Sequence, residues 1–409
     1  MEWSVGFFSL PSFYVMDYCS SRGQRARAMA FLLLVPLVIG KDIHVAAAAS
    51  EKSIFVRPDN QLVQTVGRFA RNISSGALMF DQPDTQIRLS VRNVSSIAFL
   101  LEQRIPKENA EPSDFAVFVD GKLVKSTSRS PNEFSTFSTM GGRNNSVVSY
   151  QVTLENTKEH QVTLFKLTEA AWNERNISEN YVTFSGFKLM GPDPSITPGP
   201  PLSNRKLEFI GDSITCGYCN LCHLTNASGV SSESGALAWP AQICKTLDAQ
   251  CHKTAWSGFG MVRNCCGGNT FMPEIYQRTL ATVAGSRWDF SSWVPDAVII
   301  NLGTNDHLPA EPAPVDEEFV AAYVKMVETA AARYGKDRTH FFLACGPMSE
   351  AYCDEVITVL RNVTAMGIQA SFLDQRGLIK DACCGHPSVS DDMRMASKGA
   401  LFIKKILHW

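Results

Sequence analysis

Hydrophobic and polar positions alternate along residues 51–190. A period of two is typical of strands that have one buried face and one face in solvent. The pattern covers five segments: Ile87–Val91, Phe115–Val119, Val147–Leu154, His160–Leu167 and Tyr181–Leu189. Asp120-Gly121, directly after the second segment, is a tight-hairpin dipeptide. Short strands at this spacing, with no helical period, predict an antiparallel, jelly-roll-like β-sandwich domain over residues 51–190.

The pattern changes after residue 205. Near-continuous apolar runs, as in buried parallel strands, occur at Leu207–Ile210, Ala297–Leu302, Phe341–Ala344 and Ala370–Leu373. Helical patterns lie between or after them, at Ala236–Gln250, Asp316–Tyr334, Ala351–Thr364 and Met393–Leu407. This alternation predicts a three-layer, doubly wound α/β domain over residues 205–409, with ligands bound beyond the carboxyl ends of the strands. The stretch 191–204, rich in Pro, is predicted to be a linker that forms neither helix nor strand.

Residues 1–49 are predicted to be a targeting segment rather than part of the fold. Three arginines precede the apolar run Ala28–Gly40, which is too short to span a bilayer comfortably. Small residues follow at positions 46–50. This order indicates a signal peptide and therefore secretion. An uncleaved signal anchor, which would hold the protein in a membrane of the secretory pathway, is the alternative.

Composition and charge indicate a globular protein and argue against a nucleic-acid-binding protein. The 409 residues are 45% hydrophobic and 19% charged, which is typical of a globular protein of two domains. The formal net charge is -2 and no run is rich in Lys or Arg, so a nucleic-acid partner is not expected. Acceptor sequons exceed the number expected by chance and predict N-glycosylation. They lie at Asn72, Asn93, Asn144, Asn176, Asn226 and Asn362.

Four polar blocks contain residue types used in ester hydrolysis, and two of them, at Gly211 and Gly303, directly follow apolar runs. The four blocks are Gly211-Asp-Ser213, Ser257-Gly258, Gly303-Thr-Asn305 and Gly385-His386. A serine hydroxyl exposed at a strand-to-helix turn can act as a nucleophile if an imidazole takes its proton. The N–H groups of Ser213 and Gly258 and the amide of Asn305 supply donors for an oxyanion. No Gly-x-Ser-x-Gly elbow is present, so an ordinary α/β-hydrolase is not expected.

This order of blocks resembles the SGNH (GDSL-type) hydrolases over Lys206–Trp409, and the chain after residue 50 resembles carbohydrate esterase family 2. The likeness includes Val119–Gly121, Lys166–Ala170, Phe184–Phe187, Glu208–Tyr218, Trp293–Asp296 and Asn301–Asp306. It implies a β-sandwich joined to an SGNH domain and an esterase that removes acetyl groups from polysaccharides or oligosaccharides. It also implies Ser213 as the nucleophile, His386 as the base, and Gly258 and Asn305 in the oxyanion hole, with Gly260 as the alternative to Gly258.

The sequence departs from the family pattern at the third catalytic position. An Asp often lies three residues before the His, where this chain has Cys383. We favour a Ser213–His386 dyad with a backbone carbonyl orienting the imidazole, and Asp381 is the alternative third member. A GDSL-type lipase or general esterase and a non-catalytic glycan-binding protein are the alternative functions. The sandwich domain disfavours the first, and intact Ser213, Asn305 and His386 disfavour the second.

Eleven of the twelve cysteines lie between Cys216 and Cys384. Secretion favours disulfides among them, and the odd number leaves at least one cysteine unpaired. The pairing cannot be read from the sequence. The Cys-x2-Cys-x2-Cys run that begins at Cys216 has no matching fourth ligand, so we expect neither a metal nor a cofactor. Our hypothesis is that the adjacent pairs Cys265-Cys266 and Cys383-Cys384 take part in disulfides that brace the loops carrying Gly258 and His386.

Overall fold

The computed structural model describes residues 51–104, 112–124, 135–139, 146–170, 179–225, 229–307 and 314–409. The predicted targeting segment 1–49 and the sequons at Asn144, Asn176 and Asn226 lie outside these ranges. Of the sequons inside them, Asn72 and Asn362 are exposed and Asn93 is half-buried. Across the described ranges, we find no helix with the length and apolar character needed to cross a membrane.

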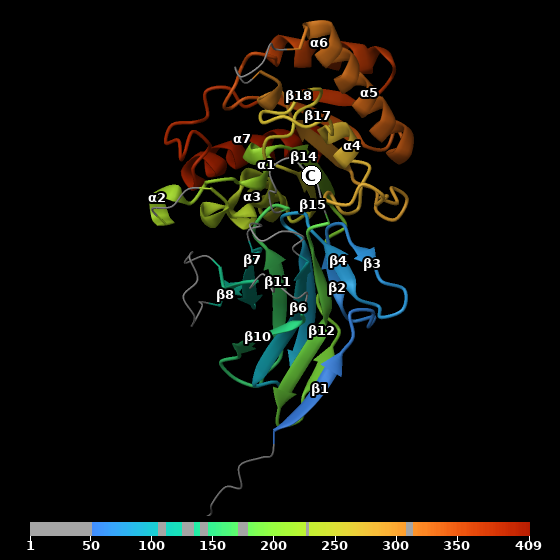
Figure 1. Ribbon diagram of the computed structural model, residues 1–409. Helices are drawn as coiled ribbons and strands as arrows, with labels where there is room; N and C mark the ends of the chain where they lie inside the picture. Colours follow the sequence, from blue (N-terminus) through green and yellow to red (C-terminus); the bar gives the residue numbers. More distant parts are fainter. Residues whose placement is uncertain are drawn as a thin grey trace, which may run out of the picture. The chain divides into compact units, whose positions relative to one another are not determined.

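Two antiparallel sheets form the first half of the described chain (Figure 1). The first has the order β10-β6-β12-β4-β3, with β1 paired to β12. Its strands are β1 (Lys52–Val56), β3 (Ala70–Arg71), β4 (Leu78–Phe80), β6 (Ser96–Arg104), β10 (Val148–Thr153) and β12 (Tyr181–Gly191). The second has the order β13-β5-β11-β7-β8, with β2 on β5 and β9 on β7. Its strands are β2 (Gln64–Val66), β5 (Gln86–Arg92), β7 (Asp114–Val119), β8 (Lys122–Leu123), β9 (Phe137–Ser138), β11 (His160–Lys166) and β13 (Ser195–Thr197).

One apolar core lies between these sheets and includes side chains from both. Phe99 and Phe187 of the first sheet pack edge to face, with ring centroids 5.6 Å apart, and Phe115 of the second is equally buried. All five predicted strand segments are strands. The hairpin at Asp120-Gly121 also forms, since both residues have the positive φ that a two-residue turn of type I′ requires.

The expectation that residues 191–204 contain no strand is wrong for four residues: Gly191 is the last residue of β12, and three more form a separate short strand. Ser195–Thr197 forms β13, which pairs antiparallel with the edge of β5 and aligns Ile196 with Val91. Ile196 and Thr197 are β-branched and suit a strand, and the flanking prolines confine the pairing to this short segment.

The second half contains a five-stranded parallel sheet with the order β15-β14-β16-β17-β18. The strands are β14 (Lys206–Gly211), β15 (Gln250–Ala255), β16 (Ala297–Asn301), β17 (His340–Cys345) and β18 (Ala370–Asp374). On one face the sheet packs against α3 (Trp239–Leu247) and α7 (Val389–Leu407). On the other it packs against α5 (Asp316–Tyr334) and α6 (Cys353–Ala365) (Figure 1). The predicted three-layer, doubly wound α/β fold is therefore confirmed.

Strand β15 was not predicted because its sequence is polar. His252 stacks on Trp293 with ring centroids 3.5 Å apart, and Lys253 pairs with Asp84. Trp293 and Asp84 thus allow the polar side chains of His252 and Lys253 to be buried. A search for apolar runs does not detect a strand of this kind. Helix α3 ends at Leu247, earlier than predicted, because Asp248 takes a left-handed φ of 47°.

Helix α7 begins at Val389, before the predicted Met393. Ser388 and Asp391 form a capping box at its N-terminus, in which each side chain accepts a hydrogen bond from the other residue's backbone N–H. The capping box adds a turn to the helix before its apolar pattern begins.

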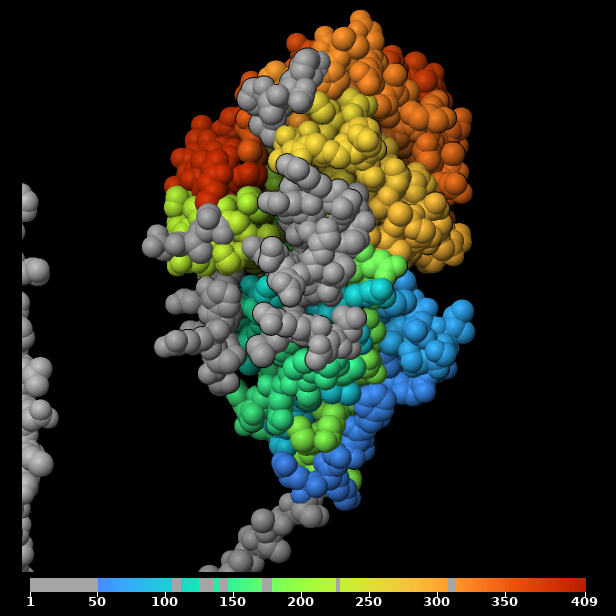
Figure 2. All heavy atoms as spheres, viewed as in Figure 1, coloured from blue at the N-terminus to red at the C-terminus, as the bar shows by residue number. Residues whose placement is uncertain are grey.

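Buried charges join the antiparallel sheets to the α/β portion. Arg68 Nη2 lies 2.8 Å from Glu208 Oε1, and neither side chain is exposed. Lys253 and Asp84 form a second buried pair at 2.6 Å. The Asp81 carboxylate accepts the N–H of Thr282 at 2.9 Å. In Figure 2, blue and cyan residues of the sheets abut green and gold residues of the α/β portion.

Candidate active site

Ser213 lies at a tight turn between β14 and the short helix α1 (Ser213–Cys216). A Cβ on Gly211 would lie 2.0 Å from Thr215 Oγ1, so the turn requires glycine there. Asp212 caps the helix by accepting the N–H of Ile214 at 3.0 Å. The turn follows β14, where the strand order reverses between β15 and β16, which is the position where doubly wound sheets bind ligands.

His386 lies directly against Ser213, as expected. Its Nε2 is 2.9 Å from Ser213 Oγ, and its Nδ1 is 3.2 Å from the carbonyl oxygen of Cys384. Because a carbonyl only accepts hydrogen bonds, Nδ1 carries the proton and the Nε2 lone pair faces the hydroxyl. Burial lowers the pKa of His386 below 6.5, so the imidazole is neutral and can act as a base near neutral pH.

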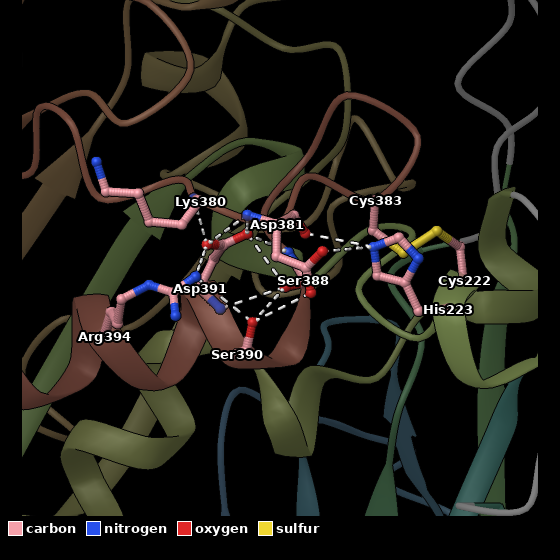
Figure 3. Close-up of polar contacts among 9 residues, drawn as sticks. All are labelled: Cys222, His223, Lys380, Asp381, Cys383, Ser388, Ser390, Asp391 and Arg394. Carbon is pink, nitrogen blue, oxygen red and sulfur yellow. Dashed lines mark hydrogen bonds and ion pairs between the residues drawn. A yellow bond between two sulfur atoms is a disulfide. The ribbon is translucent and has the colours of Figure 1, made fainter.

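The position of His386 is set by a two-residue turn that begins at Cys383. The N–H of Cys383 donates to His386 O at 2.7 Å, and the N–H of His386 donates to Cys383 O at 2.9 Å. Cys384 and Gly385, between them, have φ of 51° and 77°. Cys383 also forms a disulfide with Cys222 (Figure 3). The glycine before His386 therefore meets a backbone requirement of the turn.

Asp381 does not approach His386. Its Oδ1 lies 3.4 Å from Nε2 of His223, and its Oδ2 accepts from Ser390 Oγ at 3.4 Å (Figure 3). The structure thus places the Cys384 carbonyl, and not a carboxylate, at Nδ1 of His386. This geometry is the dyad arrangement.

The backbone N–H groups of Ser213 and Gly258 have no acceptor among the described residues. Gly258 has a φ of 82°, a conformation that glycine adopts without strain. The N–H of Gly260, in contrast, donates to Asn264 Oδ1 at 3.1 Å. Of the two glycines considered for the oxyanion hole, only Gly258 has its donor available.

Asn305 is brought to the same site, but its amide nitrogen is already bonded. Nδ2 donates to Asp212 Oδ2 at 3.1 Å and to the carbonyl of Phe259 at 2.9 Å. These bonds tie the Ser213 turn to the segment that carries Gly258. To donate a hydrogen bond to an oxyanion, Asn305 Nδ2 must therefore weaken or give up one of these two bonds.

Two acidic residues hold the Gly258 segment in place. Neither was given a role from the sequence. Glu169, between β11 and β12, accepts the N–H of Ser257 at 2.5 Å and the thiol of Cys216 at 3.4 Å. Asp306 accepts three successive N–H groups at 2.8–2.9 Å, from residues 261–263. Both lie within stretches that carried the family resemblance, which was the available signal for them.

The site lies on a buried acidic cluster. Burial raises the pKa of Asp212 to about 7, and the N–H of Ile214 opposes the shift. Burial also raises the pKa values of Glu169 and Glu233, while it lowers that of the nearby Lys166 to about 8. A carboxyl with a pKa near 7 beside Asn305 makes the local charge sensitive to pH in the neutral range.

The cysteine hypothesis holds for the loop of His386. Cys383 bonds to Cys222, whereas Cys265 and Cys266 bond to each other and support the Gly258 segment through the hydrogen bond from Cys265 N to Gly258 O at 2.9 Å. Potential ligand atoms of Cys222, His223 and Cys383 all lie within 4.8 Å of one another. Since the two sulfurs are bonded together, neither offers a thiolate to a metal ion.

Comparison with known proteins shows which proteins this chain is similar to. The sequence pattern of the GDSL-like Lipase/Acylhydrolase family matches residues 209–378, which include Ser213, Gly258 and Asn305. The resemblance of the α/β portion to the GDSL-type hydrolases is confirmed. Cellulase/esterase CelE of Acetivibrio thermocellus is 32% identical over 261 residues, which cover 61% of this chain and 30% of CelE. This chain thus spans less than a third of the length of that relative.

Other similar proteins match a larger share of this chain than residues 209–378. An acetylxylan esterase / glucomannan deacetylase of Cellvibrio japonicus is 29% identical over 266 residues, 61% of this chain and 70% of that protein. The structure of a family two carbohydrate esterase from Clostridium thermocellum in complex with cellohexaose superposes with a TM-score of 0.70 and 25% identity. It covers 85% of this chain and 99% of that one. The resemblance to carbohydrate esterase family 2 is confirmed.

Proposed function

We propose that this chain is a secreted carbohydrate O-acetyl esterase that deacetylates polysaccharides or oligosaccharides of the xylan or glucomannan type. The observation that carries the proposal is the contact of His386 Nε2 with Ser213 Oγ at 2.9 Å, with Nδ1 turned to a carbonyl. The names of the acetylxylan esterase / glucomannan deacetylase and of CelE support the substrate class.

In the proposed mechanism, His386 Nε2 takes the proton of Ser213 as Oγ attacks the acetyl carbonyl. The N–H groups of Ser213 and Gly258 bind the oxyanion, together with the amide of Asn305. His386 then returns the proton to the departing sugar hydroxyl, which leaves acetyl-Ser213. Water, deprotonated by His386, releases acetate and restores the serine. The Cys384 carbonyl stabilises the imidazolium and fixes its tautomer, a task that a carboxylate has in triads.

The proposed domain organisation is a signal segment over 1–49, a jelly-roll-like β-sandwich over 51–190, a connecting stretch over 191–204 and the hydrolase domain over 205–409. The shared core of the two antiparallel sheets supports the sandwich. Four disulfides support passage through an oxidising compartment, and so does the exposure of the sequon residues Asn72 and Asn362. Retention by an uncleaved anchor is the alternative to secretion.

The proposal is tested by assaying the purified protein on acetylated xylan, acetylated glucomannan and model esters of increasing acyl length. We expect acetate release from at least one polymer and a steep loss of activity beyond short acyl chains. A preference for long-chain esters with no release from either polymer would instead indicate a GDSL-type lipase. Binding of these glycans without turnover of any ester would indicate a non-catalytic binding protein.

A further inference from the structure

Three cysteines of the α/β portion lie outside the four disulfides: Cys216, Cys219 and Cys384. Two of them face each other. Cys219 raises the pKa of the Cys384 thiol, so the two side chains lie close enough to interact. The N–H of Gly229 donates to Cys219 Sγ at 3.2 Å, and the same backbone group lowers the pKa of Cys384, so both sulfurs lie near Gly229. Cys219 is fully buried, while Cys384 is exposed at the surface of the turn that carries His386.

Contacts on both sides hold the two thiols opposite each other. On one side, the rings of Tyr218 and His386 lie with centroids 5.0 Å apart. On the other, the disulfide between Cys222 and Cys383 brings their Cα atoms to 5.7 Å. The segments 218–222 and 383–386 therefore lie side by side, and the Cys219–Cys384 contact lies between two fixed points.

The backbone at both cysteines is unusual in the same way. Seven non-glycine residues of the described ranges have positive φ, and five of them are Asp, Asn or His, which are the types that tolerate it best. The other two are Cys219, with φ of 63°, and Cys384, with φ of 51°. Neither cysteine favours this conformation intrinsically, so a tertiary constraint must hold it at both positions.

We propose that Cys219 and Cys384 close a fifth disulfide, which fastens the turn that carries His386 to the segment that follows Ser213. The two thiols lose two protons and two electrons as the S–S bond forms. A disulfide oxidant, such as oxidised glutathione or a protein disulfide, accepts the electrons and becomes two thiols. Cys216 is then the one unpaired cysteine of the eleven. It is buried, hydrogen-bonded to Glu169, and has a thiol pKa well above its usual range because of burial.

The proposed bridge affects catalysis by holding the His386 imidazole in place. This consequence rests on the proposed function. The Cys384 carbonyl accepts the hydrogen bond from His386 Nδ1, so movement of Cys384 moves or releases the imidazole. The Cys222–Cys383 disulfide already closes the long loop, with 161 residues of separation. A neighbouring bridge adds only a small ring, so it constrains the turn locally and changes global stability little.

Peptide mapping tests the bridge directly. The full chain is alkylated in denaturant without reduction and then digested with trypsin, which leaves residues 207–245 and 381–394 as two peptides because no Lys or Arg interrupts them. Within these two peptides we expect alkylation at Cys216 only and none at Cys219 or Cys384. Alkylation of both Cys219 and Cys384 in the protein made in an oxidising compartment would overturn the proposal.

The double variant Cys222→Ala with Cys383→Ala isolates the proposed bridge from the known one. Its two peptides should stay covalently joined without reduction and separate after reduction. They should separate without reduction when Cys219→Ala is added. Cys216→Ser is the matched control, since it removes a thiol and should leave the Cys219–Cys384 linkage unchanged. If the peptides of the double variant separate without reduction, the thiols are an open pair and the proposal fails.

Kinetics test the consequence. Cys219→Ser and Cys384→Ser should lower kcat by the same factor, with KM unchanged, and the double variant should lower it no further, because either change removes the same bond. Multiplying effects in the double variant would contradict a shared bond. Mapping does not depend on activity, so a wild type that forms the bridge but releases no acetate would refute the proposed function alone.

Discussion

His386 Nε2 lies 2.9 Å from Ser213 Oγ, although 173 positions separate the two residues in the chain. The serine comes from the turn after β14, and the histidine comes from a two-residue turn before α7. The asparagine that ties the serine turn to the Gly258 segment follows β16. All three lie at the carboxyl edge of the parallel sheet, which is why they meet.

Substitution of His386 and substitution of Asp381 should change kcat by very different factors. We expect His386→Ala to lower kcat by about 10³-fold or more, because the proton acceptor for Ser213 is lost. Asp381→Asn should stay within about fivefold of wild type, the scale of an exposed ion pair, since Asp381 contacts His223 and not His386. Steady-state kinetics on one model acetyl ester compare them. Equal losses in the two variants would restore Asp381 as a triad member.

Activity should fall in acid with a midpoint below pH 6.5. Burial lowers the pKa of His386, and only the neutral imidazole accepts a proton, so kcat/KM rises with pH through that lowered pKa and is level above it. Asp212, whose pKa is about 7, contacts Asn305 and can add a second inflection. A profile of kcat/KM from pH 4 to 8 measures both, and Asp212→Asn should remove only the inflection near pH 7. A single limb with a midpoint above 7 in this variant contradicts the assignment.

Glu169 should support catalysis from outside the α/β portion. Its carboxylate accepts the N–H of Ser257, next to Gly258. We expect Glu169→Ala to lower kcat by about 10-fold to 10²-fold with little change in KM, because an oxyanion donor is displaced. Glu169→Gln, which keeps an acceptor oxygen, should recover most of this loss. Asp81→Ala is the control, since Asp81 also joins the two parts but binds Thr282. It should lower stability without lowering kcat, and equal losses of kcat in both alanine variants would indicate a general structural effect.

The buried Arg68–Glu208 pair should dominate the stability of the junction. Arg68→Met leaves the Glu208 carboxylate buried and without its cation, and we expect a loss of about 3–5 kcal/mol in the free energy of unfolding. Combining it with Glu208→Leu removes the unpaired charge and should return part of that loss. Denaturant titration of both variants measures this difference. A double variant less stable than Arg68→Met would show that the bonds of Glu208 to Tyr276 and Tyr334 outweigh the pair.

The sequence predicted the long helices, four of the five parallel strands and the residues that meet at the site, but it did not predict β6 (Ser96–Arg104) or the short strands. Apolar patterning located the four strands β14, β16, β17 and β18, and helix α5 matches its predicted bounds. Strand β15 was not predicted because His252 and Lys253 are polar. In the structure both are buried, His252 against the ring of Trp293 and Lys253 in an ion pair with Asp84. A hydropathy pattern cannot represent such interactions between residues that are distant in the chain. Tertiary contacts override local patterns at such places.

The same reason explains what was missed at the site. The carbonyl of Cys384 has no side-chain signature, so its role at His386 could be named only as a backbone option. Glu169 and Asp306 act by accepting backbone N–H groups of distant residues. The choice between Gly258 and Gly260 also depended on a hydrogen bond, from Gly260 to Asn264. Patterns of residue type do not report such pairings.

Acetate release from acetylated xylan and acetylated glucomannan by wild type and by Ser213→Ala tests the central claim most directly. We predict release by the wild type and a loss of at least ~10³-fold in the variant, the scale expected when a nucleophile is removed. Circular dichroism of the variant should match that of the wild type. The substitution removes only a small hydroxyl group, whose hydrogen-bond partner is His386. Undiminished release by a folded Ser213→Ala protein would contradict the account.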